Sequence, residues 1–158
     1  LIGAVDPAGD DVIADLGSGT GFYTDDLAPH VGSVYAVDLQ PEMHEFYREK
    51  GAPENVEFVE SDVAQLPFDD EALDAAFSTM TYHEFASDDA IAELARVLRS
   101  GGRLVLFDWS ADGDGEAGPP ADERFGVDDA VAALEAAGFE VVRAETRTET
   151  FALVALAP

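Results

Sequence analysis

The chain has 158 residues, of which 47% are hydrophobic, so it is long enough for one globular domain with a sizeable core. It contains no cysteine, which excludes disulfides, thiolate metal sites and cysteine nucleophiles, and we predict no metal site. The formal net charge is −26, from 8 basic and 34 acidic residues. A nucleic-acid substrate is disfavoured, because no basic patch is present to release counterions from phosphates.

The acidic residues are spread along the chain and do not gather in a tail. Self-repulsion of this size destabilises a compact state at low salt, and the screening length shrinks to about 3 Å near 1 M salt. The composition therefore indicates adaptation to a salt-rich cytoplasm, as in a halophile. No apolar run approaches the roughly 20 residues that span a bilayer. The chain also shows no secretory signal pattern, so we expect a cytoplasmic protein without a membrane partner.

The most informative stretch of the sequence is residues 12–21. An apolar run at 12–14 predicts a short buried strand that ends at Asp15, and a helix can begin at Phe22. Between them, three glycines stand at alternate positions: Gly17, Gly19 and Gly21. A strand, a tight glycine turn and a helix together form the nucleotide-binding corner of an open α/β sheet.

The residues around this turn indicate the kind of ligand. A dinucleotide fingerprint needs a third small residue three positions after its second glycine, where this chain has Phe22. A carboxylate at Asp15 repels a pyrophosphate and attracts an ammonium group. The pattern therefore favours a ligand that carries an amine and lacks phosphate.

Strands and helices are predicted to alternate along the rest of the chain. Apolar runs between turn signals predict strands at 34–37, 56–60, 73–77 and 103–109. Helical spacing predicts helices at 22–31, 41–50, 87–99 and 127–138. Two last strands, 139–144 and 150–156, are expected to pair as a hairpin.

The helix predicted at 41–50 has Met43, Phe46 and Tyr47 as its apolar face. A glycine at position 51 ends it. We expect His44 to be a surface residue of this helix.

Two acidic residues follow predicted strands at the edge where open sheets bind ligands. Asp38 ends the strand at 34–37 and can accept two hydrogen bonds from ribose hydroxyls, while Leu39 beside it can cover an adenine face. Asp62 follows the strand at 56–60. The alternative for Asp38 is a solvated strand-end acid, which is common in a chain with 34 acidic residues.

The stretch Asp15-Leu-Gly-Ser-Gly-Thr-Gly21 resembles motif I of the class I S-adenosylmethionine-dependent methyltransferases. Residues 94–108 strongly resemble the helix–strand unit late in the small-molecule methyltransferases of that class. The resemblance implies a single domain over residues 1–158 with an open, doubly wound, mostly parallel sheet. The implied strand order is 3-2-1-4-5-7-6, with the last strand antiparallel. It further implies S-adenosylmethionine as cofactor and methyl transfer to a small organic molecule.

The same resemblance implies which residues bind the cofactor. The glycine loop would wrap its methionine part, and an acidic residue at Asp62 would accept a hydrogen bond from the exocyclic amine of adenine. The full set of predicted cofactor residues is Asp15, Gly17, Ser18, Gly19, Gly21, Asp38, Leu39, Asp62, Val63 and Thr79.

Residues 78–85 form a polar and aromatic stretch that is predicted to face the cofactor's methyl group and the substrate, because their strand flanks the topological switch point. His83 is placed where it could act as a base, and the equal alternative is a histidine that shapes the pocket or caps the next helix. Tyr82 is a further substrate candidate. Arg124, in the long loop 110–126, could hold an anionic substrate group, and the better alternative is an arginine paired with a nearby acid.

Two other functions remain open from the sequence: an NAD(P)-dependent oxidoreductase and a non-catalytic cofactor-binding or scaffold domain. Phe22 and Asp15 count against the first, and Asp38 and Asp62 against the second. The family usually has an N-terminal helical segment over the cofactor, whereas about a dozen residues precede the first predicted strand here. The pocket is therefore expected to be open, truncated or completed by another subunit, as in a homo-oligomer.

Overall fold

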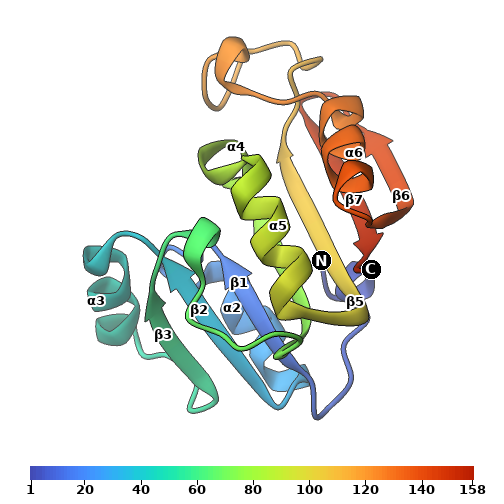
Figure 1. The fold of residues 1–158 in the computed structure, drawn as a ribbon. Helices are drawn as coiled ribbons and strands as arrows, with labels where there is room; N and C mark the ends of the chain where they lie inside the picture. Colours follow the sequence, from blue (N-terminus) through green and yellow to red (C-terminus); the bar gives the residue numbers. More distant parts are fainter.

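The computed structural model describes all 158 residues, and its seven strands form one sheet. The strands are β1 (Val12–Leu16), β2 (Ser33–Asp38), β3 (Val56–Glu60), β4 (Leu73–Thr79), β5 (Leu98–Trp109), β6 (Glu140–Thr146) and β7 (Thr150–Leu156). Their order across the sheet is β3-β2-β1-β4-β5-β7-β6 (Figure 1). β1 to β5 run parallel, and β7 lies antiparallel to both β5 and β6. The predicted strand order and final hairpin are confirmed.

Six α-helices connect or flank the strands. They are α1 (Ile2–Val5), α2 (Phe22–Leu27), α3 (Pro41–Lys50), α4 (Tyr82–Phe85), α5 (Asp88–Val97) and α6 (Val127–Ala136). Three short 3₁₀ helices are η1 (Ala28–His30), η2 (Val63–Gln65) and η3 (Ala121–Glu123). None of the helices has the length and apolar character that crossing a bilayer requires.

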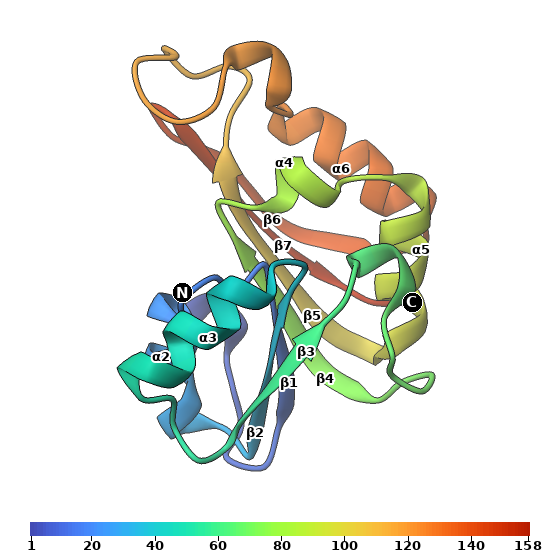
Figure 2. The same cartoon turned by 90° about the vertical axis from the view of Figure 1, so that its left-hand side faces the viewer.

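The sheet separates two apolar cores. Figure 2 shows α2 and α3 on one face of the sheet and α4, α5 and α6 on the other. Because side chains alternate along a strand, Ile13 and Phe77 pack toward α2 and α3, whereas Ala14 and Leu104 pack toward α5 and α6. Burial on both faces explains why the central strands are almost continuously apolar.

The first predicted helix is shorter in the structure. It was predicted over 22–31, but α2 ends at Leu27 and a 3₁₀ turn follows. Pro29 explains the change, because it lacks the N–H that an α-helix needs at this position and its ring clashes with the preceding turn.

The junction between α5 and β5 also differs from the prediction. The helix was predicted to reach residue 99, but α5 ends at Val97 and β5 begins at Leu98. Leu98 is buried and pairs with Leu73, and regular pairing with β4 resumes at Arg103 after an irregularity. The strand therefore starts before the glycine turn that was expected to precede it.

The prediction for the face of α3 was wrong in part. His44 was expected at the surface, but its ring is buried, whereas Phe46 is 56% exposed. His44 and Tyr47 lie three positions apart on one helical face, and both rings pack against Phe58 of β3, with centroids 5.2 and 5.3 Å away. The Nε2 atom of His44 is buried without a hydrogen-bond partner.

Burial lowers the pKa of His44, so the folded state favours the neutral ring. The stability that this neutral ring contributes is present above the usual pKa of 6.5 and is lost as the pH falls below it. His44→Phe should therefore flatten the fall in unfolding free energy between about pH 7 and about pH 5. Urea titrations at several pH values measure this unfolding free energy, and the variant His30→Gln, at an exposed histidine, is the control. An unchanged pH dependence in His44→Phe would contradict the assignment.

Candidate cofactor site

The glycine loop between β1 and α2 is fixed against the end of β2. The backbone N–H groups of Gly17 and Ser18 both donate to the carbonyl oxygen of Val37, over 2.8 and 3.0 Å. All three glycines have positive φ, at +77° for Gly17, +55° for Gly19 and +85° for Gly21. A side chain would be strained at each position, so the sequence uses glycine.

The three glycines differ in what surrounds them. A Cβ on Gly17 would lie 2.5 Å from Thr81, and a Cβ on Gly21 would lie 2.1 Å from the ring of Tyr47. Both are therefore needed for packing within the protein. A Cβ on Gly19 would meet nothing within 4 Å. The open space at Gly19 is available to a ligand.

Asp38 connects this loop to the chain that follows β2. Its Oδ2 accepts a hydrogen bond from the N–H of Gly19 over 2.9 Å, and its Oδ1 accepts one from the N–H of Gln40, also over 2.9 Å. The loop is thus held in place by protein contacts alone. Each carboxylate oxygen keeps a lone pair for further donors, such as ribose hydroxyls.

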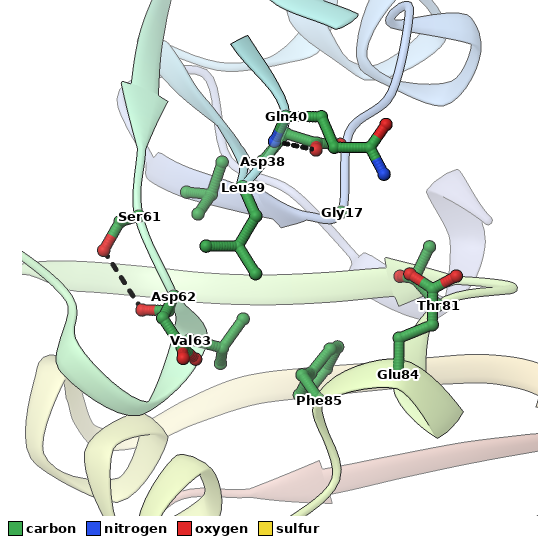
Figure 3. Close-up of a pocket in the computed structure, with 11 residues that line it drawn as sticks. Gly17, Asp38, Leu39, Gln40, Ser61, Asp62, Val63, Thr81, Glu84 and Phe85 are labelled. Atoms are coloured by element: carbon green, nitrogen blue, oxygen red, sulfur yellow. Dashed lines mark hydrogen bonds between the residues drawn. The ribbon is translucent and has the colours of Figure 1, made fainter.

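A pocket opens beside this loop at the carboxyl edge of the sheet. Asp38 is the last residue of β2, and Gly17, Asp62 and Thr81 come just after the ends of β1, β3 and β4. The full lining is Gly17, Val37, Asp38, Leu39, Gln40, Ser61, Asp62, Val63, Thr81, Glu84 and Phe85 (Figure 3). Ends of parallel strands meet at one edge, which is where open α/β sheets bind ligands.

The lining of the pocket combines acidic and apolar groups. Leu39, Val63 and Phe85 are directed into the same space from the segment after β2, from η2 and from α4 (Figure 3). Leu39 is 62% exposed, so the protein leaves an apolar surface uncovered there. The charged lining residues are all acidic: Asp38, Asp62 and Glu84. Such a pocket suits a flat, partly apolar ligand with hydrogen-bond donors or positive charge.

Asp62 begins the short helix η2 at the far end of the pocket. Its Oδ1 accepts a hydrogen bond from the N–H of Ala64 over 2.9 Å. This bond fixes the carboxylate, while Asp62 itself is exposed and Val63 beside it is buried. The second carboxylate oxygen is left to accept a hydrogen bond from a ligand amine.

Asp15 is buried at the end of β1, under the glycine loop. Its Oδ2 accepts a hydrogen bond from the hydroxyl of Thr24 over 2.5 Å, but its Oδ1 has no partner. The hydroxyl of Ser18 is likewise buried without a partner. Burial raises the pKa of Asp15 to about 7, since the charged form is poorly solvated. Unpaired buried groups of this kind fit a ligand that brings a donor or a cation.

The structure brings most of the predicted cofactor residues together. Those of the glycine loop lie at the same edge as Asp38, Leu39, Asp62 and Val63. Thr79 is buried at the end of β4 and does not line the pocket, whereas Thr81 does. The hydroxyl of Thr81 donates to the carbonyl oxygen of Leu16 over 2.9 Å and lies under the glycine loop.

Other lining residues were not singled out from the sequence. Thr81, Glu84 and Phe85 belong to the stretch 78–85 that was predicted to face the ligand, so their region was predictable and their individual contacts were not. Gln40 and Ser61 adjoin the predicted strand ends.

Neither predicted substrate residue presents a free side chain. Tyr82 is buried among Phe85, Phe125 and Phe151, at centroid distances of 5.6 to 6.3 Å, and burial raises its pKa to about 12. Arg124 has a fully buried side chain that pairs with the carboxylate of Glu149, in the turn between β6 and β7. The structure therefore favours the alternative reading of Arg124, and it places Tyr82 in the core.

His83 lies in α4, directly before the pocket-lining Glu84, and is not itself a lining residue of the pocket. Its Nδ1 is 3.0 Å from both carboxylate oxygens of Asp108, at the end of β5. Asp108 was not singled out from the sequence, because nothing in its local pattern distinguishes it from other strand-end acids.

Strand order, the antiparallel β7 and the glycine loop at the carboxyl edge define a Rossmann-like methyltransferase fold. The chain belongs to the methyltransferase domain family, whose model matches residues 14–106.

Relatives and solved structures agree with this assignment. The chain is 37% identical over 109 residues to a demethylmenaquinone methyltransferase of Clavibacter sepedonicus, a match over 68% of this chain and 44% of that protein. It is 31% identical to a SAM-dependent methyltransferase from Aquifex aeolicus, with a TM-score of 0.85 over 96% of this chain and 84% of that one.

A more distant structure shares the fold alone. The geranyl diphosphate C-methyltransferase of Streptomyces coelicolor A3(2), solved with S-adenosyl-L-homocysteine, superposes with a TM-score of 0.84 at 17% identity, over 100% of this chain and 75% of that one. The matched region spans less than half the length of several curated relatives.

Proposed function

We propose that this domain binds S-adenosylmethionine and transfers its methyl group to a small organic molecule. The main support is a pocket with three acidic lining residues and no lysine or arginine. The buried carboxylate of Asp15, under the adjoining glycine loop, has an oxygen without a hydrogen-bond partner. Acidic groups favour the sulfonium and ammonium charges of this cofactor and repel the pyrophosphate of a dinucleotide. The same observation disfavours an NAD(P)-dependent oxidoreductase.

Each part of the cofactor has a matching group in the protein. Asp15 and Gly19 would hold the methionine part, Asp38 the ribose hydroxyls, and Asp62 the adenine amine, with Leu39 against the adenine face. Bound S-adenosylmethionine supplies a methyl group already activated by the sulfonium. The protein then mainly orients the reaction partners, and orientation can contribute about 7–11 kcal/mol in good cases.

A small organic acceptor is supported by charge and by relatives. A net charge of −26 opposes binding of nucleic acid. Among the proteins this chain resembles, one is a demethylmenaquinone methyltransferase and another acts on geranyl diphosphate. Both names indicate small-molecule acceptors, and we extend that class, not those compounds, to this domain.

Isothermal titration calorimetry tests the proposal. In molar potassium chloride, S-adenosylmethionine and S-adenosylhomocysteine should bind, and NADH should not. Asp38→Ala should weaken cofactor binding by about 10-fold to 100-fold, because a hydrogen bond to a charged group contributes about 1.5–3 kcal/mol. Asp26→Ala, at an exposed acid of α2, is the matched control. Binding of NADH alone, or no cofactor binding by folded protein, would exclude the proposal.

A further inference from the structure

A second acidic group lies beside the pocket, paired with a histidine. Asp108 is only 1% exposed, yet its carboxylate is fully satisfied. Its Oδ2 accepts a hydrogen bond from the backbone N–H of His83 over 2.6 Å, and its Oδ1 accepts one from the N–H of Trp109 over 2.8 Å. The imidazole Nδ1 of His83 lies 3.0 Å from both oxygens.

This contact fixes which nitrogen of His83 is free. An ionised carboxylate can only accept hydrogen bonds, so Nδ1 must carry a proton to pair with Asp108. In the neutral ring, Nε2 is then a bare acceptor. No protein group bonds to Nε2, it is not a buried atom, and the side chain of His83 is 12% exposed. A basic nitrogen is thus oriented by a buried acid and open to solvent.

The position of the dyad matches the side where an acceptor would lie. His83 is in α4, directly before Glu84 and Phe85, which line the cofactor pocket. Asp108 is near the carboxyl end of β5, next to β4 in the sheet. The dyad therefore lies at the carboxyl edge between these two strands, where ligands of open sheets bind.

No unpaired basic side chain is available to an acceptor at this edge of the sheet. The pocket has no basic lining residue, and Arg124, in the loop after β5, is occupied. Its guanidinium pairs with Glu149 at 3.1 Å and donates to the carbonyl oxygens of Pro119, Ser110 and Ala117. A carboxylate or phosphate on the acceptor would find no cation here.

We propose that His83 is the catalytic base of this domain, that Asp108 is its positioning residue, and that the acceptor is an uncharged molecule with an ionisable O–H, N–H, S–H or C–H group. The inference rests on the proposed methyl transfer. The acceptor's X–H bond breaks as the proton passes to Nε2, and the electron pair left on X forms the bond to the methyl carbon of the sulfonium donor. The pair of the broken C–S bond stays on sulfur as a neutral thioether.

Nitrogen NMR of the imidazole rings tests the geometry without turnover. The chain has three histidines, so ¹⁵N-labelled protein gives few signals, and His83→Gln assigns the relevant ring. With S-adenosylhomocysteine bound at about pH 8, Nδ1 of His83 should carry the proton and Nε2 should be bare. Asp108→Asn should reverse this tautomer, because an amide can donate to Nδ1. A protonated Nε2 in the neutral wild-type ring would overturn the proposal.

Turnover of labelled S-adenosylmethionine tests the role. The probes are neutral phenols and catechols, each compared with a carboxylate of similar shape. His83→Gln keeps a donor for Asp108 but has no basic nitrogen, so kcat should fall by about 10²-fold or more while cofactor affinity stays unchanged. His30→Gln, at an exposed histidine, is the control.

The possible outcomes have separate meanings. Full activity in His83→Gln, or methylation of the carboxylates alone, would overturn the assignment of the dyad. A change in melting temperature without a change in kcat would show a merely structural role and also overturn it. If wild-type protein fails to bind S-adenosylhomocysteine by calorimetry, the proposed function itself fails.

Discussion

Asp15→Asn is expected to bind S-adenosylmethionine at least about ten-fold more weakly than the wild type and yet to unfold at a higher temperature near pH 8. Both effects come from one buried carboxylate. Burial raises its pKa from 3.8 to about 7, so the folded state favours the neutral form. The stability from this preference is complete below pH 3.8 and is lost as the pH rises to about 7. Above about pH 7, the ionised Asp15 lowers the free energy of unfolding by up to about 4 kcal/mol, and asparagine avoids this loss.

The same linkage predicts a pH dependence of binding. A cationic ligand favours the ionised form of Asp15, so wild-type affinity should rise with pH up to about 7 and then level off. Asp15→Asn should lose this part of the dependence. Calorimetry measures the cofactor affinity of Asp15→Asn, and thermal melts measure its stability. Asp26→Asn, at an exposed acid of α2, is the control. Wild-type affinity in Asp15→Asn would rule out a role for this carboxylate in binding.

Arg124→Met should destabilise the fold, because it removes a buried guanidinium that donates to three loop carbonyl oxygens, and a buried acceptor left without its donor costs about 1–3 kcal/mol. The guanidinium is 0% exposed, pairs with Glu149, and lies over the ring of Trp109 at 5.3 Å. Its hydrogen bonds to loop carbonyl groups hold the long segment after β5 against the sheet. Loss of these bonds should also increase proteolysis within 110–124.

A surface arginine provides the comparison for this prediction. Arg99 pairs with Asp74 at 2.9 Å but is 52% exposed, so Arg99→Met should cost only about 0–1 kcal/mol. Urea unfolding of both variants separates the cases. Equal stabilities would refute a structural role for Arg124. A raised KM for an anionic acceptor with unchanged stability would restore the substrate role considered from the sequence.

The fold was predictable because its signals are local and repeated. Each parallel strand is a short apolar run between turn residues, and each helix has its own periodicity or cap. Once the strand order was inferred from the resemblance, the carboxyl-edge rule placed Asp38 and Asp62 beside the glycine loop. Their positions depend on where strands end, which the sequence indicates within a residue or two.

The details that escaped prediction depend on contacts between distant residues. His44 is buried because Phe58 packs on it, and Arg124 because Glu149 reaches it from the β6–β7 turn. Thr81 lines the pocket in place of Thr79. Met80, between them, has a φ of +60°, a left-handed conformation that redirects the chain after β4. Spacing along the sequence cannot indicate any of these.

The position of β7 has a consequence for how this chain folds during synthesis. β7 follows β6 along the chain, yet it lies between β5 and β6 and pairs with both. Until it arrives, β5 has an open edge and β6 has no neighbour, so the growing chain presents unpaired strands to other nascent chains. The seven-stranded sheet can therefore be completed only after β7 has been made, and the large negative charge of the chain keeps such intermediates apart until then.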